Sequence, residues 1–419
     1  MLDRAPAVGS TAERLLALDL IRGVAVLGIL VINITGFAGP IAGTLSPHVP
    51  SPGAFADEAW FAFALLVFEG KMRTLFCILF GASLLLFMDK ADDVPAPGGS
   101  PGGSLQMRRL GWLAVFGYLH YLLFWWGDIL FGYALAGFAA VAFRRAPPAP
   151  LAAAALTAFL LWHALLGVSS VAGTSLEHDV LAGTAPAGVS ADYRAEQHRS
   201  AVLTEQELAG YRSGFGVQAL LKWSGSPLRP LELALSAMGE TLPLIMLGMA
   251  LLRSGFFSGA WPRPLLVRLM LGGICLGGVL TAAFISRVWP LHFPPDTMQA
   301  GLGYWLAVPH LLMAAGYGAA LMLSMPMLAS STLGRRLIAA GQMALSNYLG
   351  MTAVMTAVFY GWGLGLVGTI PERWLWPLVL GGWGLMLGCC APWLARFRHG
   401  PLEWVWRSLT LGRIVPLRR

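Results

Sequence analysis

Long blocks of apolar residues recur along the chain, and short segments that hold most of the charged side chains separate them. A helix of about 20 apolar residues is long enough to cross the hydrocarbon core of a bilayer. The pattern predicts about ten transmembrane helices. They are expected near residues 15–37, 60–88, 110–126, 129–143, 150–170, 236–252, 265–286, 303–329, 338–361 and 374–395. The predicted fold class is therefore all-α, a polytopic helical bundle whose first partner is the lipid bilayer.

Composition and charge support this prediction. Hydrophobic residues make up 57% of the chain and charged residues 12%, which is far more apolar than a soluble domain. The net charge of +7 comes from Lys and Arg in short connecting segments, as in the cytoplasmic loops of membrane proteins. This distribution predicts that both termini are cytoplasmic, and no nucleic-acid partner is expected.

Two polar segments interrupt the apolar blocks. Residues 89–104 are rich in Pro, Gly and Ser, which predicts a flexible cytoplasmic linker. In residues 172–235 charged and apolar positions alternate, and Thr204 and Glu207 have the spacing of a capping box, so we expect an extracytoplasmic (periplasmic) cap with one or two helices. The expected domains are an N-terminal membrane region, the cap, and a C-terminal membrane region with a basic tail, over residues 1–171, 172–235 and 236–419.

The first apolar block carries three polar residues, Asp19, Arg22 and Asn33. At about 100° per residue, a helix places all three on one stripe. Asp19 and Arg22 are three residues apart, so they can neutralise each other. Either this pair anchors the helix at the interface and Asn33 bonds a neighbouring helix, or the stripe faces a polar cavity.

The second block carries Glu69 and Arg73 four residues apart, with Lys71 on the opposite face. These charges either snorkel to the interface or belong to an intramembrane site. The block is too long for one straight span, so a helix over 60–68 is expected to bend into a span that starts near Thr74.

Residues 110–143 are too many for one span and barely enough for two, and Gly127 and Asp128 interrupt them. We expect a tight helical hairpin whose turn lies below the outer surface, with His120 about two turns deeper. Imidazole has a pKa suited to proton transfer near neutrality. His120 is therefore a candidate catalytic residue or a hydrogen-bonded packing residue, and its contact with Asp128 requires that the hairpin folds back.

Other histidines and the cysteines give weaker signals. His310 follows Pro309 and is a second candidate, although the proline also suits a structural kink. His48 lies in a proline-rich segment and is expected to be an ordinary loop residue. The four cysteines lie inside apolar blocks without the spacing of a zinc site, so neither a disulfide nor a metal is expected.

Six blocks resemble, in order, the YeiB-like family of bacterial membrane proteins, which carry the domain of unknown function 418. They read RLLALDLIRGVAVLGILVINI, FEGKMRTLFCILFGASL, GYLHYLLFWWGDILFGYALAG, LPLIMLGMALLRSGFF, GQMALSNYLGMTAVMTAVFYGWGLGLVG and HGPLEWVWRSLTLGR. The resemblance implies a multi-pass protein of the bacterial inner membrane. The Asp-x-x-Arg-Gly helix of the first block is also similar to membrane acyltransferases of the heparan-alpha-glucosaminide N-acetyltransferase and acyltransferase-3 types. That similarity implies transfer of an acyl group from cytoplasmic acyl-CoA to a sugar or other acceptor on the far side.

The sequence departs from the glucosaminide enzymes in the loop after the first helix, where those enzymes carry a catalytic histidine. His48 lies in this loop without their surrounding residues, so it does not inherit the role. The YeiB-like pattern has its histidine in the block LHYLLFWWGDIL, and His120 and Asp128 are therefore the expected catalytic residues.

The expected mechanism uses acyl-CoA as a co-substrate and no permanently bound cofactor. Guanidinium groups suit phosphate, and His120 would act as a general base or a transient acyl acceptor. Asn347 and Tyr348 either donate to the oxyanion or form interhelical hydrogen bonds. The expected substrate-binding residues are Asp19, Arg22, Asn33, Glu69, Arg73, Arg108, Arg109, His310, Asn347 and Tyr348.

Two other classes of function stay open. A transporter also places charged residues inside the membrane, and a non-catalytic scaffold would leave its polar stripe fully paired. One continuous channel lined by Arg22, His120 and Asp128 would favour the enzyme. The acceptor is expected to be a small molecule or glycan, and the sequence is compatible with a homo-oligomer.

Overall fold

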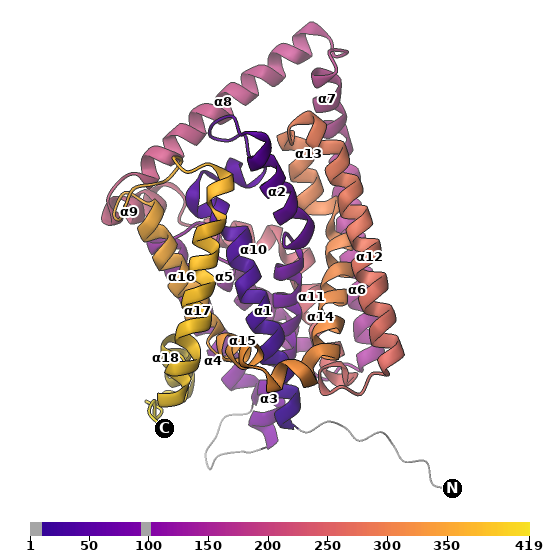
Figure 1. The fold of residues 1–419 in the computed structure, drawn as a ribbon, viewed down its shortest axis with the longest axis vertical. Helices are drawn as coiled ribbons and strands as arrows, with labels where there is room; N and C mark the ends of the chain where they lie inside the picture. The colour runs from indigo at the N-terminus through magenta and orange to yellow at the C-terminus, as the bar shows by residue number, and fades with distance from the viewer. Residues whose placement is uncertain (1–10, 94–101) are drawn as a thin grey trace.

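A computed structural model describes residues 11–93 and 102–419 (Figure 1). Over these residues the fold is all-helical, and its only β-type pairing is an isolated bridge between Phe397 and Arg418. This confirms the predicted all-α class. The long helices are α1 (Thr11–Ala38), α3 (Lys71–Asp93), α4 (Gly102–Leu123), α6 (Pro148–Ser169), α12 (Arg263–Val288), α14 (Ala307–Ser330) and α17 (Trp376–Arg396).

Shorter helices complete the bundle and cover one of its ends. In the bundle they are α2 (Phe55–Val67), α5 (Leu130–Ala140), α10 (Arg229–Ser236), α11 (Met238–Arg253), α15 (Thr332–Gln342), α16 (Ala344–Phe359) and α18 (Pro401–Leu411). At one end lie α7 (Val171–Leu181), α8 (Ala187–Tyr211), α9 (Phe215–Gly225) and α13 (Pro295–Ala300). We call this the cap end. The opposite end, where α1 begins and α15 and α18 lie, is the basic end (Figure 1).

α1 is the central helix of the bundle. It packs against α3, α14, α15, α16 and α17, and its apolar residues from Leu18 to Phe37 form much of the main core. Protein or lipid has to cover the apolar surface of a helix. Because five helices cover α1, its polar residues Asp19, Arg22 and Asn33 are partly buried in the protein.

Fewer helices qualify as membrane spans than the sequence predicts. In the described part of the chain, six helices are long and apolar enough to cross a membrane, or seven if the bent pair α10 and α11 counts as one span. The expected span 338–361 is divided into α15 and α16, and the block 129–143 yields a helix of 11 residues in α5. The helices thus have the character of membrane spans, but six or seven of them qualify by length and composition instead of the ten predicted.

The two polar segments also differ from their predictions. α3 continues to Asp93 and α4 begins at Gly102, so both ends of the expected linker 89–104 are helical, and residues 94–101 lie outside the described residues. The segment 172–235 holds most of α7, all of α8 and α9 and most of α10, which is more helix than expected. α8 crosses the cap end from α7 to α9 (Figure 1).

The second block is interrupted at Phe68–Gly70, but its two helices together form one candidate span, Phe55–Asp93, so the predicted bend is not established. α2 ends at Val67, and α3 begins at Lys71 instead of near Thr74. Gly70 has φ +71°, and a Cβ atom there would lie 1.9 Å from the Nδ1 atom of His310. Only glycine combines this left-handed backbone with so close an approach. The break between α2 and α3 therefore depends on Gly70.

Candidate functional site

The predicted hairpin forms, and its turn brings two polar side chains together. α4 ends at Leu123 and α5 begins at Leu130. The Nδ1 atom of His120 lies 2.8 Å from the Oδ2 atom of Asp128, and both side chains are almost completely buried. The hairpin therefore folds back as the contact requires, and a His–Asp pair lies inside the bundle.

Hydrogen bonds orient this pair. The backbone N–H of Phe131 donates to the Oδ1 atom of Asp128 at 2.8 Å, so the carboxylate stabilises the start of α5 and keeps Oδ2 for His120. A carboxylate only accepts, so the hydrogen between the two groups belongs to Nδ1 of His120. The Nε2 atom is buried and has no hydrogen-bond partner. A histidine held by a carboxylate with its other nitrogen free is arranged as a general base.

A cavity of about 180 Å³, which we call the basic-end cavity, lies between the hairpin and the basic end. Aromatic side chains of α3, α5 and α18 form part of its wall. Its polar lining residues include Arg22, Ser83, Arg109, Tyr133, Gln342, Tyr348 and Glu403. Two guanidinium groups in a mostly apolar cavity make it a candidate anion site.

Arg22 and Arg109 are both held in place. The Nη1 atom of Arg22 lies 2.7 Å from the Oδ1 atom of Asp19, which confirms the predicted pair, and Nη2 donates to the Oγ atom of Ser83 at 2.7 Å. The guanidinium of Arg109 stacks 4.3 Å from the centroid of the Trp406 ring. Arg108, which the sequence grouped with Arg109, is exposed and donates to the carbonyl oxygen of Leu409. Arg108 does not line the cavity.

A second cavity of about 210 Å³, the cap-side cavity, lies on the other side of the hairpin. Its polar lining residues are Asn33, Thr35, Thr44 and Glu69 together with the indoles of Trp125 and Trp126. Asn33 lines this cavity and Arg22 lines the other, so the polar stripe predicted on α1 faces both cavities.

The hairpin turn separates the two cavities. Trp125 and Trp126, just before the turn, line the cap-side cavity, while Ile129 and Leu130, just after it, line the basic-end cavity. Asp128 lies between these residues in the chain. The hairpin that carries the His–Asp pair therefore lines two separate cavities, in place of the continuous channel considered from the sequence, and neither His120 nor Asp128 lines either cavity.

Charged side chains near Glu69 bind groups on other helices. Arg73 contacts Glu240 of α11, with Nη2 to Oε2 at 2.8 Å, instead of Glu69. The amine of Lys71 is fully buried and donates to the carbonyl oxygen of Leu65 at 2.7 Å. The snorkelling alternative for Lys71 is therefore wrong. Four charged side chains lie close together, and among them that of Arg73 is 35% exposed.

His310, Asn347 and Tyr348 have distinct positions. His310 is buried against Gly70 and lines neither cavity. The side-chain amide of Asn347 donates to the carbonyl oxygen of Ala340 at 2.9 Å, which is the interhelical bonding considered as its alternative role. Tyr348 lines the basic-end cavity, and its ring centroid lies 5.2 Å from that of His120.

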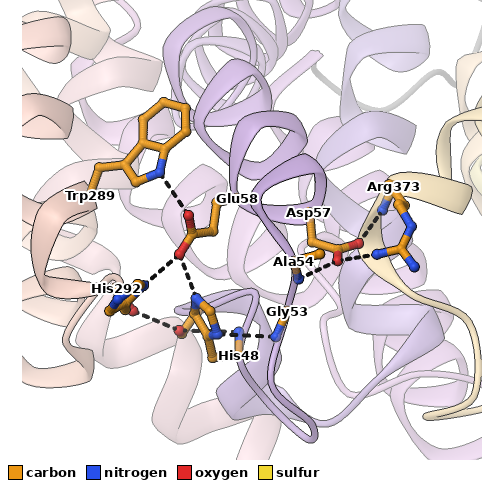
Figure 2. Close-up of polar contacts among 9 residues, drawn as sticks. His48, Gly53, Ala54, Asp57, Glu58, Trp289, His292 and Arg373 are labelled. Carbon is orange, nitrogen blue, oxygen red and sulfur yellow. Dashed lines mark hydrogen bonds and ion pairs between the residues drawn. The ribbon is translucent and has the colours of Figure 1, made fainter.

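Sequence reasoning missed a second polar cluster near the cap end. Figure 2 shows that His48, Glu58 and His292 point toward one another from the segment after α1, from α2 and from the segment after α12. Their ligand atoms lie within 4.8 Å of one another. No spacing rule joins residues at positions 48, 58 and 292, because the fold alone brings them together. The expectation that His48 is an ordinary loop residue does not describe these contacts.

The sequence also missed partners of the expected site residues. Ser83 holds Arg22, and Glu240 holds Arg73. Glu240 carried a detectable signal, since it is an acidic residue inside the apolar block 236–252. Glu403 accepts the backbone N–H groups of Leu345 and Ser346 at the start of α16, and burial raises the pKa of its carboxyl group.

The fold and site define a polytopic helical membrane protein with a buried His–Asp pair on a hairpin that lines two cavities. Comparison with known proteins then identifies its family. The chain is 31% identical over 411 residues to the "Uncharacterized protein YeiB" of Escherichia coli (strain K12). The aligned region covers 96% of this chain and 98% of YeiB. The chain belongs to the YeiB-like family.

Further comparisons agree with this assignment. Residues 251–413 match the family described as "Protein of unknown function (DUF418)". The "Uncharacterized protein YxaH" of Bacillus subtilis (strain 168) is 28% identical over 426 residues, which covers 98% of this chain and 97% of YxaH. No solved structure matches the chain.

Proposed function

We propose that this protein transfers an acyl group from acyl-CoA on one side of the membrane to an acceptor on the other. The observation that carries the proposal is the buried His120–Asp128 pair, on a hairpin that lines a cavity with two arginines and a cavity whose polar groups include Asn33 and Glu69. A general base in that position can serve reactants that enter from opposite sides.

The proposal includes a topology. We assign the basic end to the cytoplasm, because the short connections with Lys and Arg favour that side, and the cap end to the periplasm. Ten crossings result if α4, α5, α11 and α16 cross together with the six long apolar segments. An even number of crossings places both termini in the cytoplasm, and the inner membrane is the proposed location.

Acyl-CoA would enter the basic-end cavity. This cavity, at about 180 Å³, is smaller than the roughly 300–1,000 Å³ typical of pockets for drug-sized ligands. It therefore suits only part of the co-substrate, and the rest of CoA stays outside. The Arg109 guanidinium stacked on Trp406 is suited to phosphate, since its donor edge remains available.

The acceptor would enter the cap-side cavity, where Asn33, Thr35 and Glu69 offer hydrogen-bonding groups suited to a hydroxyl-rich molecule such as a carbohydrate. The Nε2 atom of His120 takes the proton of the acceptor hydroxyl or amine as that atom attacks the thioester carbonyl. The C–S bond then breaks, and the CoA thiolate leaves with the proton that His120 returns. Asp128 stabilises the imidazolium between these two transfers.

Transport is the second candidate, and one observation favours it. Glu69, Lys71, Arg73 and Glu240 lie close together, beside the buried imidazole of His310. Intramembrane ionisable groups often form proton or ion paths. A transporter would move its substrate without breaking a thioester bond, so the two proposals predict different products.

The deciding experiment uses the full-length protein in inverted inner-membrane vesicles, which expose the basic end and supply natural acceptors. Radiolabelled acetyl-CoA is added, and both free CoA and label in the membrane fraction are measured. We expect protein-dependent CoA release and label transfer, lost in His120→Ala, with binding of acetyl-CoA weakened in Arg22→Ala. Neither binding nor release with acetyl-CoA or longer acyl-CoAs would overturn the proposal and leave transport as the function to test.

A further inference from the structure

We propose that His48, Glu58 and His292 form a binding site for a divalent transition-metal ion, with Zn²⁺ as the expected occupant. The Nε2 atom of His48 and the Nδ1 atom of His292 both lie 2.7 Å from the Oε1 atom of Glu58. Two imidazoles and one carboxylate are a ligand set that Zn²⁺ accepts in four-coordinate sites with one open position. This inference departs from the absence of a metal expected from the cysteine spacing.

The geometry needs an adjustment to hold an ion. The three ligand atoms lie within 4.8 Å of one another. Around a tetrahedral Zn²⁺ with ligands at about 2.0–2.2 Å, ligand atoms lie roughly 3.3 Å apart. Each imidazole nitrogen therefore has to move away from Oε1 by a fraction of an ångström, and the two nitrogens have to reach a similar distance from each other.

Supporting contacts orient the carboxylate, as is usual around metal ligands. The indole N–H of Trp289 donates to the Oε2 atom of Glu58 at 2.9 Å (Figure 2). This bond leaves Oε1 as the oxygen directed at the two histidines. The Glu58 side chain is 8% exposed, whereas that of His292 is 71% exposed, so solvent reaches the fourth coordination position through the His292 side.

The backbone that presents His292 is unusual. His292 and Phe293 have φ values of 56° and 57°, and they are the non-glycine residues with positive φ in the described structure. Such conformations cost free energy and persist where the surroundings enforce them, which is common at functional sites. Phe293 is fully buried and packs on Phe61, one turn along α2 from Glu58. The buried phenylalanine holds the segment so that His292 reaches the carboxylate.

One contact changes when an ion binds. The backbone N–H of Gly53 donates to the Nδ1 atom of His48 at 3.0 Å, so in the metal-free form the hydrogen of His48 is on Nε2. An ion on Nε2 requires that hydrogen on Nδ1, where it would meet the Gly53 amide hydrogen. Metal binding is therefore expected to release the Gly53 amide and to shift residues 50–54.

The test uses full-length protein without a polyhistidine tag, purified in detergent and depleted of metal with a chelator. Co²⁺ is titrated as a spectroscopic probe, followed by competition with Zn²⁺ and by elemental analysis. We expect one ion per chain, the intense visible absorption of four-coordinate Co²⁺, and faster hydrogen exchange at Gly53 in the loaded protein.

The variants distinguish a site from adventitious binding. Glu58→Gln keeps the shape of the side chain and removes its charge, and His292→Ala removes an exposed ligand without opening a buried cavity. Both are expected to lose the absorption. His178→Ala, which removes an exposed histidine beside Asp179, is the matched control and should retain it. Binding that is absent in the wild type, or equal in wild type and Glu58→Gln, would overturn the proposal and leave the cluster as a hydrogen-bonded contact between α2 and the segment after α12.

Discussion

The Nδ1 atom of His120 lies 2.8 Å from the Oδ2 atom of Asp128. Asp128 is eight residues further along the chain, in the connection between α4 and α5. This hydrogen bond decides which imidazole nitrogen is free. Since Asp128 also accepts the backbone N–H of Phe131, its carboxylate is fixed at both oxygens and cannot easily release the histidine.

The first prediction follows from this bond and concerns Asp128→Asn. The asparagine carbonyl can still accept the Phe131 amide, and its NH₂ group then faces Nδ1 of His120. The imidazole hydrogen is forced onto Nε2, which removes the lone pair that the general base needs. We expect CoA release to fall by roughly 100-fold or more, measured with a thiol reagent. The thermal unfolding midpoint serves as the control for folding, and an unchanged rate in a folded variant would contradict the assignment of His120 as base.

The second prediction separates two neighbouring arginines. Arg109 lines the basic-end cavity and stacks on Trp406, whereas Arg108 is exposed and bonds the carbonyl of Leu409. Arg109→Ala should weaken acetyl-CoA binding about tenfold or more, since a charge-assisted bond to phosphate contributes about 1.5–3 kcal/mol. Arg108→Ala is the matched control and should change binding less than twofold. If calorimetric titrations show that both variants weaken acetyl-CoA binding equally, the positive charge of the basic end attracts acetyl-CoA in general and the cavity is not its binding site.

These two arginines also illustrate what the sequence could and could not predict. Neighbouring residues on a helix point about 100° apart, so residue type alone could not say which arginine faces the cavity. Local relationships were predictable, because Asp19 and Arg22 share a helix face and Gly127 and Asp128 break an apolar run. Long-range ones were not, since the partner of Arg73 lies 167 residues away.

The dependence on long-range packing also explains why the sequence predicted more spans than the structure shows and missed the cluster of His48, Glu58 and His292. Hydropathy reports how apolar a block is, but the interruption of 338–361 at Met343 and the bend between α10 and α11 depend on packing. His48 and His292 come from segments that look like ordinary loops, and only the fold places them at Glu58.

The third prediction concerns the crossing of α1 and α15, which holds Arg22 in position. A Cβ atom at Gly341 would lie 1.8 Å from the backbone oxygen of Asp19. Gly341→Ala should therefore force the helices apart and destabilise the protein by about 1–3 kcal/mol. Gly350→Ala is the control, because nothing lies within 4 Å of its Cβ position. Thermal unfolding in detergent checks both variants, and acetyl-CoA binding should weaken only in Gly341→Ala. Equal unfolding midpoints for the two variants would mean that the crossing is less tight than the structure shows.

The fourth prediction concerns pH and Lys222 of α9. Burial lowers the pKa of its amine to about 7, and the amine donates to the carbonyl oxygen of Tyr121 at 3.0 Å. Between pH 7 and the ordinary lysine pKa, the unfolded chain binds more protons at this position than the folded one, so its contribution to stability rises with pH. Replacing Lys222 with Met should flatten the increase in unfolding midpoint between pH 7 and 9. Lys90→Met, at an exposed lysine, should leave the increase unchanged, and a Lys222→Met curve parallel to the wild type would refute this linkage.

The fifth prediction tests the proposed orientation with single cysteines in a chain whose native cysteines are replaced by alanine. Ser200 is exposed on α8 at the cap end, and Arg336 is exposed on α15 at the basic end. If the cap end is periplasmic, a maleimide that cannot cross the inner membrane labels Ser200→Cys in intact cells with a permeable outer membrane. Arg336→Cys should be labelled only after the inner membrane is broken, because its short, Arg-rich connection favours the cytoplasm. The reverse pattern would place the arginines of the basic-end cavity on the periplasmic side, where cytoplasmic acyl-CoA cannot reach them. Labelling in intact cells thus tests the acyl-transfer proposal before any acceptor is known.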